Sequence, residues 1–109
     1  MGGRNLRKDF PSYLGRIFED IVKEFLIIQS KSNNLPFKIT KIGKWWHRDK
    51  EIDIVALNEN SGDIMFIEVK WKDNVNAEKI LNELEEMAKY VRWRNESRRE
   101  HFAIFAKSF

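Results

Sequence analysis

Three ionisable residues fall inside two strongly apolar stretches of the chain: Asp53 in "EIDIVAL", and Glu68 and Lys70 in "DIMFIEVKW". Burying a charged side chain is costly unless it is paired with an opposite charge or bound to a metal ion. Two carboxylates held close together repel each other unless a cation or a proton lies between them. Carboxylate oxygens are the ligands that Mg²⁺ prefers, with water and substrate phosphate completing its coordination. The three residues therefore predict a magnesium site that acts on phosphate esters.

The chemistry expected of such a site is hydrolysis of a phosphoester. A divalent ion polarises a phosphoryl oxygen, lowers the pKa of a bound water and stabilises the leaving oxygen. Lys70 would orient the attacking water or neutralise charge that develops on the phosphate. The alternative is a structural ion pair, in which Lys70 neutralises Asp53 or Glu68 at the edge of a sheet. A short E-x-K pattern alone does not decide between the two, since it is frequent by chance.

The two stretches that carry these residues have the pattern of adjacent strands. Both are almost continuously apolar and rich in β-branched residues, which is typical of central strands covered on both faces. The short connection "NENSG" predicts an antiparallel hairpin. Side chains alternate across a strand, so Glu68 and Lys70 point to one face. A tight hairpin would place Asp53 beside Glu68 on that face.

The remaining elements follow from apolar periodicity. A helix is expected over residues 12–29, with Ser12 as its N-cap after Pro11. Its predicted buried stripe consists of Leu14, Ile17, Phe18, Ile21, Val22, Phe25 and Ile28. A strand is expected in "FKITKIGKWW", a second helix over residues 76–96, and a last strand in "HFAIFAK". The order αβββαβ predicts an α/β fold with a mixed central sheet flanked by helices.

Size and composition favour one globular domain over residues 1–109. Apolar residues make up 42% of the chain and charged residues 34%, which is typical of a soluble protein and not of a disordered one. The longest apolar runs are too short to cross a bilayer, and no secretory signal is evident, so we expect a cytoplasmic protein without membrane contact. The absence of cysteine excludes thiolate chemistry, and two histidines are too few for a zinc site.

Basic residues gather near the C-terminal end of the second predicted helix. The segment "KYVRWRNESRR" interleaves aromatic residues with five cations, which are Lys89, Arg92, Arg94, Arg98 and Arg99. Such a mixture suits the phosphate backbone of DNA, and its alternative is a solvated helix face. Arg16 and Lys72 are further candidates for phosphate contacts. Of the adjacent Trp45 and Trp46, we expect one in the core, while the other either packs at an interface or stacks on a base.

The arrangement of these residues resembles the PD-(D/E)XK, or restriction-endonuclease-like, nuclease superfamily. That superfamily has an αβββαβ core with an acidic residue on the first helix, an Asp on the second strand and (D/E)-x-K on the third. The matching positions here are Glu19 in "GRIFED", Asp53, Glu68 and Lys70. The resemblance spans essentially the whole chain. The proline of the family pattern is absent, since Glu51 and Ile52 precede Asp53.

A narrower resemblance implies possible partners. The segments "GRIFEDIVKEFL", "IGKWW", "EIDIVALNE", "IEVKWK" and "FAIFAKSF" are similar to a nuclease-like domain at the C-terminus of many archaeal AAA-type ATPases. This implies an ATPase domain as a partner, while the chain itself has no phosphate-binding loop of its own. Archaeal Holliday-junction resolvases also resemble the chain, which implies branched DNA as an alternative substrate and a homodimer as an alternative assembly.

Together, the residues and the resemblance predict a Mg²⁺- or Mn²⁺-dependent endonuclease that hydrolyses phosphodiester bonds in DNA. Asp53, Glu68 and the backbone carbonyl of Val69 would bind the metal, Lys70 would position water, and Glu19 would complete the acidic site. The competing expectation is a non-catalytic module of an ATPase, which binds DNA or protein and keeps the carboxylates only as structural pairs.

Overall fold

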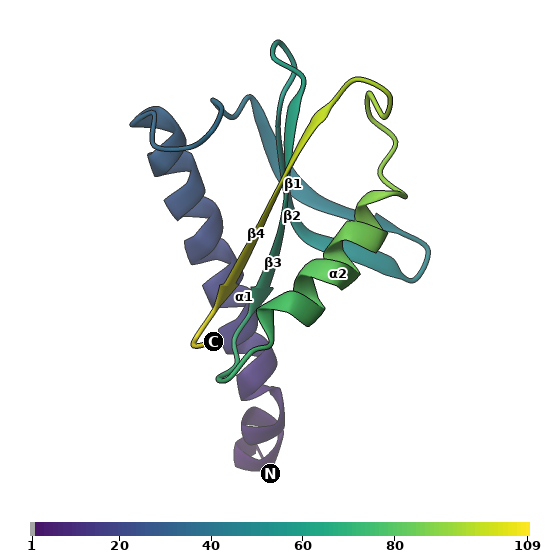
Figure 1. Cartoon of the computed structure of the whole chain (residues 1–109). Helices are drawn as coiled ribbons and strands as arrows, with labels where there is room; N and C mark the ends of the chain where they lie inside the picture. Colours follow the sequence, from purple (N-terminus) through teal and green to yellow (C-terminus); the bar gives the residue numbers. More distant parts are fainter. Residues whose placement is uncertain (1) are drawn as a thin grey trace.

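The chain is described by a computed structural model that covers residues 2–109, with side chains described from residue 12 onward. Its elements are α1 (Gly2–Lys31), β1 (Lys41–His47), β2 (Lys50–Asn58), β3 (Asp63–Lys70), α2 (Ala77–Ala88) and β4 (Arg99–Ala106). The predicted order αβββαβ is confirmed. Figure 1 shows the two helices on either side of the strands, with α1 running well beyond the sheet at its N-terminal end.

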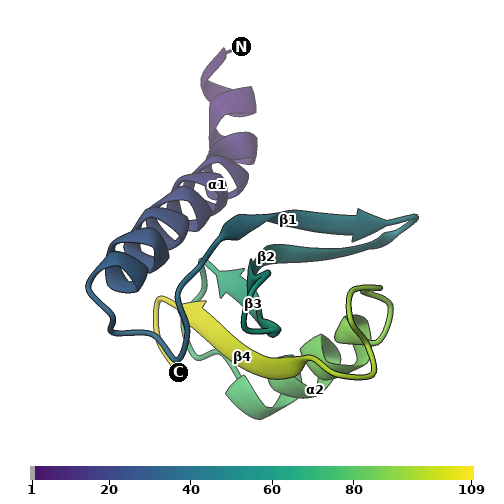
Figure 2. The same ribbon diagram turned by 90° about the horizontal axis from the view of Figure 1, so that it is seen from above.

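The sheet is mixed, as predicted, and its strands lie in the order β1-β2-β3-β4. The first three strands are antiparallel, and β4 returns parallel to β3 after the α2 crossover. Figure 2 shows α1 and α2 covering opposite faces of this sheet. Val22 and Leu26 of α1 pack against one face, and Leu84 and Ala88 of α2 pack against the other. The two central strands are therefore covered on both sides, as their continuous apolar sequences indicate.

The β2–β3 hairpin has the predicted antiparallel form. Its ladder runs from the pair Asn58 and Asp63, next to the turn, to the pair Ile54 and Ile67. The Asn58 side-chain carbonyl accepts the backbone N–H groups of residues 60 and 61, at 2.7 and 2.8 Å. Gly62 then has a φ of +81°, a conformation that glycine adopts at little cost. These local features fix the register that positions Asp53 relative to Glu68.

The first helix differs from its prediction at both its start and its buried face. It runs from Gly2 to Lys31, so Ser12 lies inside the helix and is not its N-cap. Proline removes one backbone hydrogen bond inside a helix, and here the helix continues through Pro11. The stripe that contacts the sheet consists of Phe18, Val22 and Leu26. A second apolar stripe is exposed by 37–58%, and it consists of Tyr13, Ile17, Ile21, Phe25 and Ile28.

The second helix ends eight residues earlier than predicted. Asn76 is its N-cap and accepts the backbone N–H of Lys79, but the helix stops at Ala88. Residues 89–98 form a loop, in which side chains bond to backbone N–H and carbonyl groups that would pair with one another in a helix. The Asn95 side chain donates to the carbonyl of Val91 and accepts the N–H of Trp93. The basic segment is therefore a loop that crosses from α2 to β4, and not a helix face.

Candidate active site

The candidate site lies where the β2–β3 ladder ends. Beyond the pair Ile54 and Ile67, carboxylate oxygens replace backbone carbonyls as acceptors. Asp53 Oδ2 accepts the backbone N–H of Val69 at 2.9 Å, and Glu68 Oε1 accepts the N–H of Asp53 at 3.4 Å. Each strand thus holds the carboxylate of the other strand. The hairpin register brings Asp53 and Glu68 side by side on one face, at the positions that the sequence predicts.

Lys70 lies next to this pair and only partly neutralises it. Its Nζ is 3.6 Å from Glu68 Oε2. Burial raises the pKa of Glu68, the charge of Asp53 raises it further, and Lys70 opposes both, with a pKa of about 7 as the result. Protonation of Glu68 relieves its repulsion by the charge of Asp53. A bound cation would relieve the same repulsion.

A cavity of about 270 Å³ opens over the carboxylates. Its polar wall comes from β2 and β3 and includes Glu51 in addition to Asp53, Glu68 and Lys70. Its opposite wall comes from α2 and consists of Ile80, Glu83, Leu84 and Met87. Three of these four α2 residues are apolar, so the helix gives the cavity a mostly apolar wall, with Glu83 as its one carboxylate, opposite the polar groups of β2 and β3.

Glu19 reaches the border of this site, where a lysine that the sequence analysis did not single out binds it. Lys44 Nζ of β1 is 3.2 Å from Glu19 Oε1. Burial raises the pKa of Glu19, Lys44 opposes this effect, and the charge of Asp53 adds to it. Glu19 is thus close enough for the charge of Asp53 to change its pKa. Among residues 12–109, however, no three His, Cys, Asp or Glu side chains are grouped tightly enough to hold a metal ion.

The candidate DNA-contacting residues divide into two groups. Arg16, Lys72 and Arg92 have exposed side chains, and so does Arg94, although its guanidinium also donates to the carbonyl of Glu59. Two other arginines are used within the fold. The side chain of Arg98 is only 3% exposed and donates to the carbonyls of Ala88, Val91 and Trp93. Arg99 forms an ion pair with Asp63.

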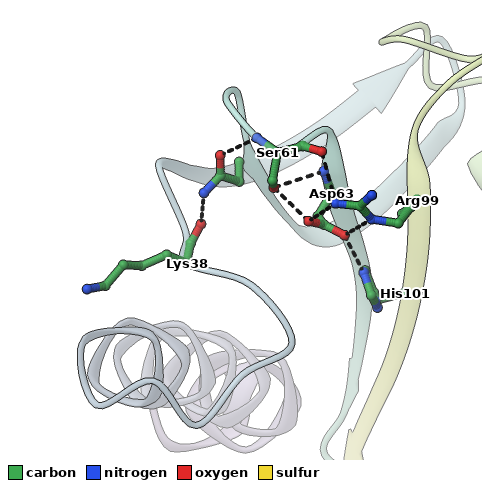
Figure 3. Close-up of polar contacts among 6 residues, drawn as sticks. Lys38, Ser61, Asp63, Arg99 and His101 are labelled. Atoms are coloured by element: carbon green, nitrogen blue, oxygen red, sulfur yellow. Dashed lines mark hydrogen bonds and ion pairs between the residues drawn. The ribbon is translucent and has the colours of Figure 1, made fainter.

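A second polar cluster, also not anticipated, lies at the other end of the same hairpin (Figure 3). Asp63 is 5% exposed and accepts two hydrogen bonds from the Arg99 guanidinium, at 3.0 and 3.1 Å. Its oxygens also contact Ser61 Oγ at 2.6 Å and His101 Nε2 at 3.0 Å. Arg99, His101 and Ser61 together lower the pKa of Asp63 well below its ordinary value. This cluster joins the turn and β3 to β4, and we assign it a structural role.

Comparison with known proteins shows a family. A family model described as archaeal and bacterial proteins of unknown function matches residues 2–80. The chain is 49% identical over 88 residues to the "Uncharacterized protein MJECL04" of Methanocaldococcus jannaschii. The match covers 79% of this chain and 20% of that protein, so the chain spans about a fifth of the length of its relative. No solved structure matches the chain.

Proposed function

We propose that this chain, which belongs to the DUF234 family of archaeal and bacterial proteins of unknown function, is a Mg²⁺-dependent nuclease that hydrolyses phosphodiester bonds in DNA. The observation that supports the proposal is the position of Asp53 and Glu68. Their carboxylates lie side by side where two strands separate, with a lysine 3.6 Å away and a cavity above them. A structural ion pair would have one carboxylate and one cation, and here one of the two carboxylates lacks a full counter-charge.

The donor set fits a magnesium ion of the kind that keeps several water ligands. Mg²⁺ is usually held by one or two carboxylates, with water and substrate phosphate as its other ligands. Asp53 Oδ2 and Glu68 Oε1 accept backbone N–H groups, and Glu68 Oε2 pairs with Lys70. Asp53 and Glu68 are the residues proposed to hold the ion. When bound, the ion would polarise the phosphate and lower the pKa of a water. The backbone carbonyl of Val69 stays a proposed third donor.

The side chains around the carboxylates have distinct proposed roles. Lys70 orients the attacking water or neutralises the charge that develops on the phosphate. Glu19 contributes through a water molecule, because its carboxylate is paired with Lys44. The exposed Arg16, Lys72, Arg92 and Arg94 bind the DNA backbone as positive charges. Arg98 and Arg99 are left out of this set because their guanidinium groups bind within the fold.

A second candidate function is a module that docks DNA or another protein without cutting DNA. The observation that favours it is the length of the relative, of which the matched segment makes up 20%. An attached ATPase module, as the resemblance implies, would then carry the activity. A Holliday-junction-resolvase-like enzyme is the alternative within the nuclease proposal, with branched DNA as its substrate.

A cleavage assay tests the nuclease proposal. The purified chain is incubated with supercoiled, linear duplex, single-stranded and branched DNA in Mg²⁺ or Mn²⁺, beside the variant Glu68→Ala. We expect divalent-dependent cleavage of at least one DNA form by the wild type and none by the variant, with DNA binding unchanged. Cleavage by neither protein, together with undetectable metal binding by calorimetry, would overturn the proposal and favour the docking module.

A further inference from the structure

Trp46 is an exposed aromatic residue on β1, the strand that pairs with the one carrying Asp53. It is 66% exposed on β1, directly opposite Glu51 of β2. Residues directly opposite in an antiparallel ladder share a face, with Cβ atoms roughly 5 Å apart. Glu51 and Asp53 both line the cavity over the carboxylates, and the register of β1 against β2 shifts by one residue between the two positions. Trp46 is therefore the direct cross-strand neighbour of a residue that lines this cavity, at the border of the carboxylate site.

The surroundings of Trp46 combine aromatic surface with positive charge. A surface hollow of about 480 Å³ is lined by Trp45, Trp46, His47, Lys89, Tyr90 and Arg92. Tyr90 is 52% exposed, and Lys50 Nζ lies 4.9 Å from the centroid of its ring. Aromatic rings with cations between them are what single-stranded nucleic acid binds, because bases stack on the rings and the cations neutralise phosphates. A small apolar ligand would not require the cations.

The other tryptophans of the chain have partners within the fold. Trp45 packs against the core cluster on the α2 side of the sheet, and so does Trp93. Trp71 makes an edge contact with Phe18, at 5.1 Å between ring centroids, and Lys107 Nζ lies over its ring at 4.8 Å. Trp46 differs because it is mostly exposed and lies opposite Glu51, which lines the carboxylate cavity. Packing explains the first three residues and does not explain Trp46.

We propose that Trp46 is a base-stacking residue and that the substrate is DNA with unpaired nucleotides next to the bond that is cut. In a duplex, each base is covered by its neighbours, and only an unpaired base offers a free face to an indole. Tyr90 is the second stacking surface, and Lys89 and Arg92 bind the adjoining phosphates. The substrate class rests on the proposed nuclease activity, whereas the stacking is a property of binding and holds without cleavage.

Binding measured without divalent ions separates stacking from catalysis. The full chain in EDTA is titrated against a labelled single strand and the corresponding duplex, with anisotropy as the readout. We expect the wild type to prefer the single strand and Trp46→Ala to weaken single-strand binding about 5- to 100-fold. Trp46→Phe should restore most of the affinity, because a smaller ring still stacks. The matched control is Tyr13→Ala, which removes a 54% exposed aromatic residue from α1 and should leave binding unchanged.

A strand with abasic positions adds a readout that a structural role for Trp46 would not move. Wild-type affinity should fall on this strand by at least the factor that Trp46→Ala causes on the normal strand, because stacking on both Trp46 and Tyr90 is lost. Trp46→Ala should therefore weaken binding to the abasic strand much less than binding to the normal strand. The salt dependence of binding should stay the same in the variant, since no phosphate contact is removed. The stacking proposal would be overturned if Trp46→Ala weakened binding to the normal and the abasic strand by the same factor, or if it did not weaken binding at all. This holds even if the chain cuts DNA. A Trp46-dependent preference without any cleavage would support stacking and count against the nuclease.

Discussion

The two ends of the β2–β3 hairpin carry carboxylates of opposite character, a buried one next to the turn and a partly buried pair at the other end. Next to the turn, Asp63 has an arginine, a histidine and a serine as partners, which together hold its pKa well below the ordinary value. At the other end, burial and the neighbouring Asp53 raise the pKa of Glu68 to about 7, against one lysine at 3.6 Å. Asp63 and Glu68 both lie on β3 and both carry a carboxylate. The difference is the number of cationic and hydrogen-bond donors that each carboxylate finds.

This difference separates a carboxylate that stabilises the fold from one that is available to a ligand. A buried acid with a full set of donors contributes to stability, and its removal leaves those donors without partners. A buried acid with a like charge beside it costs stability, and a fold retains that cost most often at a functional site. The four predictions below test this division, from the largest expected effect to the smallest.

The first prediction concerns cleavage. Asp53→Asn is expected to reduce DNA cleavage at least about 100-fold, because loss of a ligand should exceed the 10- to 100-fold effect of losing a supporting residue. Asp63→Asn is its matched control at the other end of the hairpin, and it should keep wild-type cleavage at a temperature where it is folded. Initial rates on the preferred DNA form measure both. Equal losses in the two variants would mean that the ends of the hairpin do not differ in function.

The second prediction concerns the sign of the stability change. Asp63→Asn is expected to lower the free energy of unfolding by about 1–3 kcal/mol, because it weakens a buried hydrogen-bonded cluster. Glu68→Gln is expected to raise it at about pH 8, where the wild-type carboxylate is ionised beside Asp53. Urea denaturation without divalent ions measures both values. A destabilised Glu68→Gln protein would show that Glu68 belongs with Asp63 as a structural acid.

The third prediction concerns pH. Unfolded Glu68 titrates near the ordinary value of 4.5 and folded Glu68 near 7, so between these pH values only the folded chain holds the proton. Stability is therefore expected to fall by about 3 kcal/mol as the pH rises from about 4.5 to 7, and then to level off. Asp63, with its lowered pKa, has the opposite effect, and its contribution disappears in strong acid. Urea denaturation of wild type and Glu68→Gln across this pH range measures the effect. Only the wild type should show the fall in the free energy of unfolding between about pH 4.5 and 7.

The fourth and smallest prediction concerns the Glu19–Lys44 pair. Lys44→Gln is expected to tighten Mg²⁺ binding about 2- to 5-fold, because a partly exposed ion pair of this kind is worth about 0.2–1 kcal/mol and its loss frees the Glu19 carboxylate. Lys41→Gln is the control. Lys41 lies on β1, as Lys44 does, and its substitution breaks an ion pair with Glu59 in the β2–β3 turn. Calorimetric titration gives both affinities. Weaker Mg²⁺ binding by Lys44→Gln alone would mean that Lys44 holds Glu19 in position for the metal.

Local sequence was sufficient to predict the strands and the side-by-side carboxylates. Side chains alternate across a strand, so Glu68 and Lys70 must share a face, and the short turn determines which strand lies next to them. The Glu19–Lys44 pair could not be predicted in this way, because the two residues meet only when α1 packs against the sheet. A lysine on the strand before Asp53 was the available signal, and it pointed to no particular partner.

The two helix errors have separate physical causes. Both faces of α1 are apolar over several turns, so periodicity could not show that Val22 and Leu26 contact the sheet while Ile21 and Ile28 are exposed. The end of α2 was missed because the apolar spacing continues through Val91 beyond it. Beyond Ala88, the Asn95 side chain takes the carbonyl of Val91, and the Arg98 guanidinium reaches back ten residues to cap the carbonyl of Ala88. Such capping from a distance leaves no local pattern in the sequence.

The buried Arg98 also has a consequence for the thermodynamics of ligand binding. Its planar, fork-shaped donor group fastens three carbonyls of the segment that carries Lys89, Tyr90 and Arg92. Ordering a flexible segment on binding would cost about 1–2 kcal/mol of conformational entropy for each residue fixed. Arg98 removes that cost in advance by ordering the segment during folding. Lysine, with a single ammonium group on a flexible stem, could not reproduce this pre-organisation.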